Sequence, residues 1–288
     1  MLSTSFTVPT TGNGKIIPKV ASDLDFFLPF RQHAPSLKKA RHEIYSNIDQ
    51  LLRDDGVGFF NVLAFRGVFF GSPFARSPRY RWFHSLDDWN NFHASEENEA
   101  KKFSNDEYYA NKQCYGQYQS TRELSLLDSY WIECKRWNVM FNKQRTPTVK
   151  EVFIWLNLSE MNIDQTTGKK KKKTVFRNIG PLTALLICGD LVEANILPMP
   201  TSKDWGTLIA EVGKGAQAGM EMFGLVEIGC DEDDICNAFI SLDLALQREL
   251  RDDEKKTMGY NVIMLEHTLC KIKRLASRIT MPEILYEL

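Results

Sequence analysis

The stretch FRNIGPLTALLICGDLVE, residues 176–193, decides the fold that we expect for this chain. Its segment Asn178-Ile179-Gly180-Pro181 predicts a tight turn, because glycine adopts a positive φ without steric cost and proline suits the first position of a helix. The residues that follow are strongly apolar, and one face combines leucines with Gly189. We therefore predict a turn followed by a helix that packs closely on another helix.

The start of this helix is also a candidate site for a DNA phosphate. The first backbone N–H groups of a helix have no partner within the helix, and the helix dipole adds partial positive charge there. The pattern is typical of a helix-hairpin-helix turn, and we assign the DNA contact to Asn178, Ile179 and Gly180. An ordinary capping turn in a helical core explains this stretch alone equally well.

Apolar periodicity along the rest of the chain predicts an all-α protein. Of the 288 residues, 43% are hydrophobic and 11% are aromatic, which is enough to form a substantial core. Besides the helix from residue 181, we expect helices at 36–54, 59–70, 86–102, 124–142, 148–161, from 204, at 231–250 and from 252 or 255 to 278. We expect residues 1–22 to be a flexible N-terminal arm and residues 23–288 to form a single helical domain.

Charge and cysteine content restrict the possible partners. The net charge is −1, so any attraction to nucleic acid requires a local basic patch. The six cysteines form no CxxC pair, which argues against a zinc site and favours a reduced, intracellular protein, nuclear if the source is eukaryotic. No apolar run reaches membrane-spanning length and no signal peptide begins the chain, so we expect a soluble protein without a membrane partner. We expect no metal and no cofactor.

A lysine-rich loop is expected at residues 164–174, DQTTGKKKKKT. Five consecutive lysines repel one another and should be solvated. The segment is either a flexible surface loop, a nuclear localisation signal, or a contact to the DNA backbone beside the turn. For the last of these we assign Lys170, Lys171 and Lys172.

Two further stretches offer cations or backbone amides for phosphate. Arg66 interrupts the apolar run 59–70, and an arginine there is either paired with a carboxylate, partly exposed, or in contact with an anion in a cleft. The stretch 212–219, VGKGAQAG, places Lys214 between Gly213 and Gly215 and suits a close backbone approach to phosphate. It lacks the GxxxxGK[ST] spacing of a P-loop, so ATP hydrolysis is not expected.

Two groups of side chains suit chemistry or base recognition. Residues 103–122 mix four tyrosines with amides and cations, which suits stacking on a nucleobase or, equally, a polar loop over the core. Glu266 and His267 are adjacent in the last helix, four and three residues before Cys270. Such a pair is usually structural, and the lack of a second histidine argues against a metal.

Four separated patches, at 61–70, 178–191, 204–220 and 265–278, carry a resemblance to a known family. The sequence resembles the helical domain family of alpha-glutamyl/putrescinyl thymine pyrophosphorylases, also described as amino acid:DNA transferases and as the helical domain attached to hydroxymethyluracil DNA kinases. It departs from the family at Asn178, where glycine is more common, at the lysine run, and at residues 272–274, which replace an acidic-aromatic pattern.

The resemblance implies a DNA-glycosylase-like helical fold built around a helix-hairpin-helix. It implies transfer of an amino acid or polyamine amine onto an activated, pyrophosphorylated hydroxymethyl pyrimidine in DNA. Lys214 with the amides of Gly213 and Gly215 would hold the pyrophosphate, assisted by Arg66. Asp190 or Glu266 would bind or deprotonate the amine, and His267 would relay the proton. Because no P-loop is present, activation of the base would need a separate kinase as a partner.

Two other functions remain open on the sequence. One is a DNA glycosylase, although such enzymes resemble one another in an Asp about twenty residues beyond the hairpin glycine. Here Asp190 comes too early and Asp204 slightly late. The other is a non-catalytic DNA-binding subunit. Replacement of Lys214 separates them, because only a transferase would lose turnover while retaining DNA binding.

Overall fold

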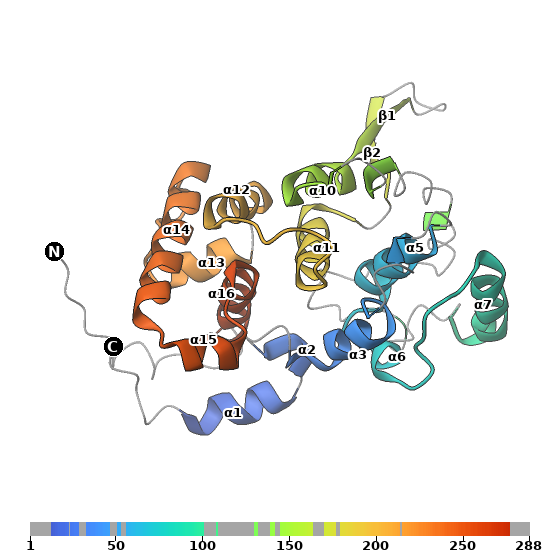
Figure 1. Ribbon diagram of the computed structural model, residues 1–288, viewed down its shortest axis with the longest axis horizontal. Helices are drawn as coiled ribbons and strands as arrows, with labels where there is room; N and C mark the ends of the chain where they lie inside the picture. The colour runs from blue at the N-terminus through green and yellow to red at the C-terminus, as the bar shows by residue number, and fades with distance from the viewer. Residues whose placement is uncertain are drawn as a thin grey trace.

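Helices dominate the computed structural model of this chain (Figure 1). The structure describes residues 13–22, 24–28, 33–46, 51–52, 56–100, 108, 130–131, 139–141, 145–163, 170–176, 179–213 and 215–276. Within these residues the prediction of a mostly helical protein is confirmed. The departure from an all-α fold is one antiparallel pair of strands.

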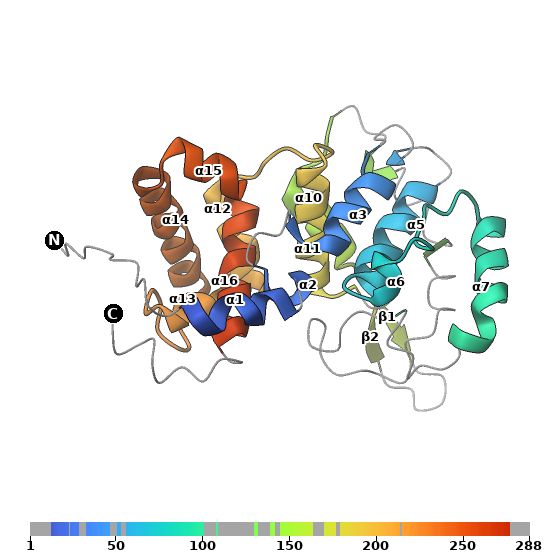
Figure 2. The same cartoon turned by 90° about the horizontal axis from the view of Figure 1, so that it is seen from below.

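The helices form two groups that lie side by side (Figures 1 and 2). The first group, called here the α11 lobe, contains α3 (Pro35–Glu43), α5 (Val57–Ala64), the π-helix η2 (Phe65–Phe69), α6 (Pro73–Arg76), α7 (Leu86–Ala100), α10 (Val149–Leu156) and α11 (Pro181–Glu193). The second, the α16 lobe, contains α1 (Asn13–Ser22), α12 (Ser202–Val212), α13 (Ala216–Met222), α14 (Glu232–Glu249), α15 (Asp252–Met258) and α16 (Val262–Ala276). The short helix α2 (Leu24–Phe27) packs against both α3 and α16, and one hydrophobic cluster includes buried residues of both lobes.

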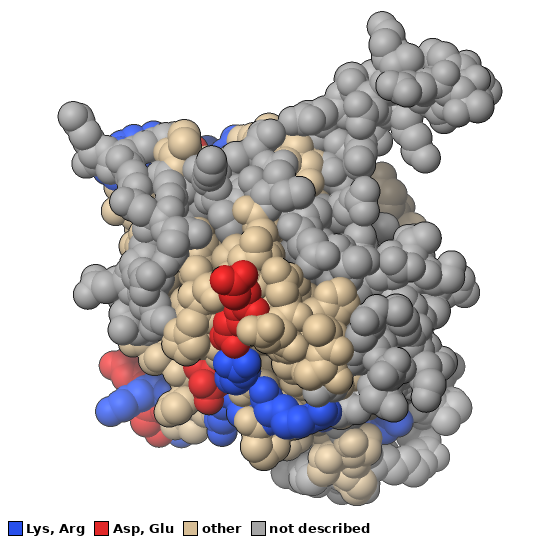
Figure 3. Space-filling model, turned by 90° about the vertical axis from the view of Figure 1, so that its right-hand side faces the viewer, with Lys and Arg blue, Asp and Glu red and all other residues tan. Residues whose placement is uncertain are grey.

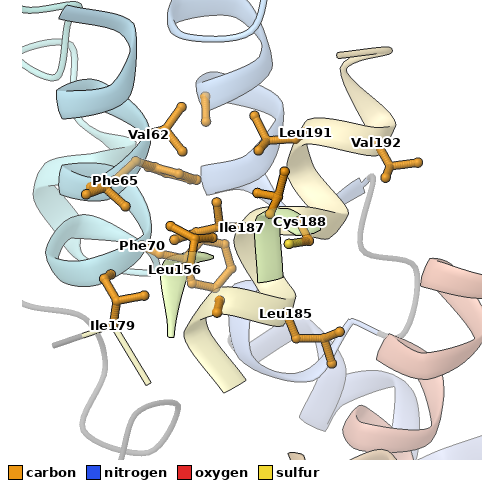
Figure 4. Packing of buried hydrophobic residues seen from close by; sticks show 14 of the residues in the cluster. Val62, Phe65, Phe70, Leu156, Ile179, Leu185, Ile187, Cys188, Leu191 and Val192 are labelled. Carbon is orange, nitrogen blue, oxygen red and sulfur yellow. The ribbon is translucent and has the colours of Figure 1, made fainter. Parts of the chain in front are cut away.

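The predicted central helix is present as α11, with Pro181 in its first turn. Most of its side chains are buried, and it packs against α10 and η2. Figure 4 shows Ile187 of this helix among Val62, Phe65 and Phe70. Close packing of an apolar helix on aromatic neighbours explains why this stretch organises the lobe.

The apolar run 59–70 is a buried helix, as expected, but its second half is wound more loosely. The N–H of Phe70 donates to the carbonyl of Phe65 at 2.7 Å, which is the i→i+5 bond of a π-helix. This π-turn carries Arg66 into the core. Segments of this kind are frequent at functional sites, and here the turn sets the position of one candidate residue.

Several predicted boundaries are wrong. Residues 13–22 of the expected flexible arm form α1, which packs against α2 and α16. The expected helix 36–54 begins at Pro35 and ends at Glu43, and the expected last helix is two helices separated by Gly259 at φ 63°. A glycine with positive φ ends a helix at low cost, which the apolar periodicity alone does not show.

The lysine-rich segment is also not wholly a loop. Lys170–Thr174 forms strand β2, which pairs antiparallel with β1 (Ser159–Ile163), so the expected helix 148–161 ends at Leu156. Glu160 stands opposite Lys173 in this register. The pairing is a backbone register between two strands that are distant in the chain, which apolar periodicity does not predict. Residues 164–169 lie outside the described part of the chain.

Candidate functional site

Arg66 and Asp190 form a buried ion pair between η2 and α11. The Nε and Nη2 atoms of Arg66 donate to Oδ2 and Oδ1 of Asp190, and each residue is only 1% exposed. Tyr45 adds a hydrogen bond from its hydroxyl to Asp190 Oδ2 at 3.3 Å. The Arg66 guanidinium also lies 4.1 Å from the centre of the Phe70 ring, where a cation–π contact forms. Two hydrogen bonds in parallel make this the strongest geometry for an arginine–carboxylate pair.

This pair decides between the alternatives left open at Arg66 in favour of a carboxylate partner. Arg66 was expected to assist phosphate binding, and Asp190 to handle the amine. In this structure each side chain is directed at the other and is enclosed by the core. The geometry therefore gives both residues a role in holding η2 against α11.

The N-terminus of α11 is open to the surface at Gly180. Gly180 is half-buried with φ −105° and ψ −179°, so the positive φ expected for a tight turn is absent, and the backbone is extended. Its carbonyl accepts the first helical bond from Ala184 N at 2.9 Å. A side chain added at Gly180 would meet nothing within 4 Å. Among the described residues, therefore, the Cβ side of Gly180 is open next to the first turn of α11.

The two residues before Gly180 contribute less than expected. Ile179 is buried, and its N–H donates to the carbonyl of Phe176 at 3.1 Å, so this amide is already used. Asn178 lies outside the described residues. The phosphate contact assigned to Asn178, Ile179 and Gly180 therefore reduces, in the described part of the chain, to Gly180 and the helix turn that it opens.

The second candidate turn joins α12 to α13. Gly213, at φ +61°, ends α12 by donating its N–H to the carbonyl of Ile209 at 3.0 Å, and Gly215, at φ +69°, precedes α13. Lys214 between them lies outside the described residues. Both glycines adopt conformations that other residues rarely take, which explains their presence in the sequence.

The glycines of this stretch also let α13 approach α16 closely. A Cβ atom at Gly215 would lie 3.2 Å from Cys270 Sγ, and one at Gly219 would lie 2.4 Å from the carbonyl oxygen of Leu269. Packing of two helices at this distance requires glycine at Gly219. The expected phosphate cradle therefore has a structural function, and it lies directly beside the helix that bears Glu266 and His267.

Glu266 and His267 are buried on α16, at 2% and 6% exposure. They lie in the α16 lobe, whereas Asp190 lies on α11 in the other lobe (Figure 1). The structure thus separates the three expected catalytic residues into two buried places. It brings Arg66 together with Asp190, and the 213–215 turn together with α16.

A buried network around Asp25, which the sequence patterns did not predict, joins the two lobes. Asp25 Oδ1 and Oδ2 accept hydrogen bonds from the N–H and hydroxyl of Ser36, each at 2.8 Å, and Arg76 approaches to 3.5 Å. Lys271 of α16 donates from Nζ to the backbone carbonyl of Asp25. An aspartate in the apolar segment DLDFFLPF is the signal that would have found it, as Arg66 was found.

Basic residues of the segment 72–81, which contains α6, also have partners. Arg81 forms an exposed pair with Asp88 at 2.7 Å, and the Arg79 guanidinium lies 5.9 Å from the ring of Tyr108, which is fully buried. Tyr108 is therefore not available to stack on a base. On the face shown in Figure 3, basic and acidic side chains of the described residues lie next to one another and form no uniform basic surface.

Among the described residues, no helix is long and apolar enough to cross a membrane, and no group of three or more His, Cys, Asp or Glu side chains is placed to hold a metal ion. Comparison with known proteins adds no assignment: the chain matches no family model, no curated protein and no solved structure.

Proposed function

We propose that this protein binds DNA at the N-terminus of α11 and transfers an amine onto an activated hydroxymethyl pyrimidine in the bound strand. The observation that carries the DNA contact is the open first turn of α11, which follows a lysine-bearing strand by a few residues. The chemistry rests on the family resemblance of the sequence. DNA and an activating kinase are the partners that this proposal requires.

The position of α11 suits a phosphate. Its 13 residues align enough peptide dipoles to give partial positive charge at Gly180, where a built Cβ atom would meet no described residue within 4 Å. Strand β2, with its lysines, ends at Thr174, only six residues earlier. The strand would add salt-dependent attraction to the backbone, which the near-neutral net charge of the whole chain does not supply.

The transfer step requires three groups. The bond from the pyrimidine methylene carbon to the pyrophosphate oxygen breaks, a carbon–nitrogen bond to the amine forms, and the ammonium product loses a proton to a base. Lys214, in the turn between α12 and α13, is the proposed cation for the departing pyrophosphate. Glu266 and His267 are the proposed base and relay, because the turn packs against their helix at Cys270. Asp190 is left to its pair with Arg66.

The DNA contact is tested by Gly180→Asp. An aspartate at this position caps the helix and complements its dipole, so the free energy of unfolding should rise by about 0.5–1 kcal/mol. The same carboxylate occupies the proposed phosphate position and repels DNA, so affinity should fall by about tenfold or more, equivalent to about 1.4 kcal/mol. Fluorescence anisotropy with labelled duplex and urea unfolding measure the two effects.

Gly180→Asn is the matched control, because asparagine caps the helix without adding charge. It should stabilise the fold by about a few tenths of a kcal/mol, less than aspartate does, because it lacks the charge that complements the dipole, and it should weaken DNA binding less. Unchanged DNA affinity in Gly180→Asp would show that the phosphate is held elsewhere. If Gly180→Asp raises the free energy of unfolding and lowers the DNA affinity, the loss of binding comes from a lost contact and not from a damaged fold.

The reaction is tested by incubating the protein with DNA that contains pyrophosphorylated hydroxymethyluracil and a mixture of amino acids and polyamines. Nucleosides released by digestion are then weighed. A mass equal to thymidine plus an amine supports the transferase and names the donor. Unmodified nucleosides indicate a binding subunit, and free base with abasic sites indicates a glycosylase. Lys214→Ala should abolish transfer but retain DNA binding, whereas Lys203→Ala, exposed on α12, should retain both.

A further inference from the structure

A hollow on the outer side of the α16 lobe is separate from the proposed DNA site. It has a volume of about 480 Å³ and lies between the loop 224–230 and the first turns of α14. Figures 1 and 2 place α14 at the edge of the molecule, on the side away from α11. None of the residues assigned to DNA binding or transfer lines it.

The loop at this hollow presents apolar side chains to solvent. Ile228 is 90% exposed and Leu225 is 41% exposed, and both line the hollow. Isolated exposed apolar residues are common, but two on one rim of a hollow mark a surface that another molecule can cover.

The backbone of the loop is held in place. Gly224 and Gly229 have φ values of 66° and 85°, and hydrogen bonds run from Leu225 N to Met220 O at 3.0 Å and from Cys230 N to Glu227 O at 3.2 Å. Ile228 is thus displayed by a defined turn, so binding there would cost little ordering of the loop.

The two charged residues that line the hollow, Glu227 and Asp234, are both acidic. Residues 215–247 contain seven Asp or Glu and no Lys, Arg or His. Of these acids, Glu227 and Asp234 line the hollow, and residues 231–233 lie next to Asp234 in the chain. All five side chains are exposed. Burial, and then the charges of Asp234, Glu221 and Asp231, raise the pKa of the Cys230 thiol, as expected in a negative field.

We propose that this hollow docks a basic segment of a partner protein, which places an aliphatic side chain against Ile228 and Leu225 and lysines or arginines against Glu227 and Asp234. Charge complementarity favours this occupant, because the negative field repels nucleic acid and acidic peptides. The apolar rim supplies contact area that charge alone does not. The site would join the enzyme to a partner while α11 remains open to DNA.

The test uses a fluorescein-labelled peptide of alternating lysine and leucine, titrated with the full-length protein and followed by anisotropy. We expect saturable binding that weakens when salt is raised from about 0.05 M to about 0.3 M. Ile228→Ser should weaken binding by about tenfold, which corresponds to about 1.4 kcal/mol of lost apolar burial. Glu227→Gln with Asp234→Asn should weaken it at low salt and flatten the salt dependence.

Leu244→Ser is the matched control. Like Ile228, Leu244 is an exposed aliphatic residue, but it lies on α14 and does not line the hollow. It should bind the peptide as the natural chain does. Absence of saturable binding, equal binding of a glutamate–leucine peptide, or an unchanged affinity in Ile228→Ser would each overturn the proposal. So would self-association of the protein that Ile228→Ser abolishes, since the occupant would then be a second copy.

Discussion

Replacement of Asp190 by asparagine tests whether the buried pair is structural or catalytic. The substitution keeps the shape of the side chain and removes its charge, which leaves the Arg66 guanidinium in the core without its anion. Breaking a buried pair by removing one partner costs about 3–5 kcal/mol. Asparagine can still accept one hydrogen bond from Arg66, so we expect a loss near the lower end, about 3 kcal/mol.

The matched comparison is Glu193→Gln, on the same helix. Glu193 pairs with Arg41 at 2.7 Å; the Glu193 side chain is 7% exposed, but the Arg41 side chain is 35% exposed, so water screens this pair more than the Arg66–Asp190 pair. We expect a loss of about 1 kcal/mol or less. Both substitutions remove a carboxylate charge from α11, so the difference between the two losses of stability reports the burial of the arginine partner.

Urea unfolding followed by circular dichroism measures both changes. With a slope of about 2–3 kcal/mol/M, a loss of 3 kcal/mol moves the midpoint by about 1–1.5 M. Arg66→Met combined with Asp190→Leu should recover much of the loss, because a packed apolar pair needs no counter-ion. If Asp190→Asn lowers stability by less than about 1 kcal/mol and abolishes amine transfer, the structural assignment is refuted and the catalytic one restored.

Two further perturbations test packing and pH dependence. Gly219→Ala places a Cβ atom against the carbonyl oxygen of Leu269 and should lower the free energy of unfolding in urea by about 2 kcal/mol. Gly180→Ala, whose Cβ atom would lie in open space, should lower it by less than about 1 kcal/mol. Equal losses would contradict the close crossing of α13 and α16. The hydrogen bonds of Glu151 to Arg145, followed by that to the Thr148 backbone, lower its pKa from 4.5 to about 2, so its contribution to stability is present above pH 4.5 and is lost as pH falls through about 2. The denaturation midpoint of Glu151→Gln should therefore fall less steeply over that pH range than that of the natural chain, and identical slopes would rule out this pair as a source of acid sensitivity.

The sequence alone determined most of the helices and the central position of residues 176–193. Apolar periodicity, the proline at the start of α11 and the aspartate that caps α14 are local signals, and each acts within a few residues. The boundaries that failed depend on distant contacts. Strand β2 forms because β1 is available to pair with it, and local propensity does not contain that information.

Only the tertiary structure decided what the candidate residues contact. The sequence left Arg66 paired with a carboxylate, partly exposed or in contact with an anion. Asp190 is 124 positions away, and only the packing of η2 against α11 selects it as the partner. Likewise, only the packing of α13 against α16 shows that the glycine-rich stretch 212–219 forms a close helix crossing on the helix that bears Glu266 and His267. The type of a residue determines which kind of partner its side chain needs when it is buried, because desolvation makes an unpaired charge costly. The fold determines which partner lies within reach.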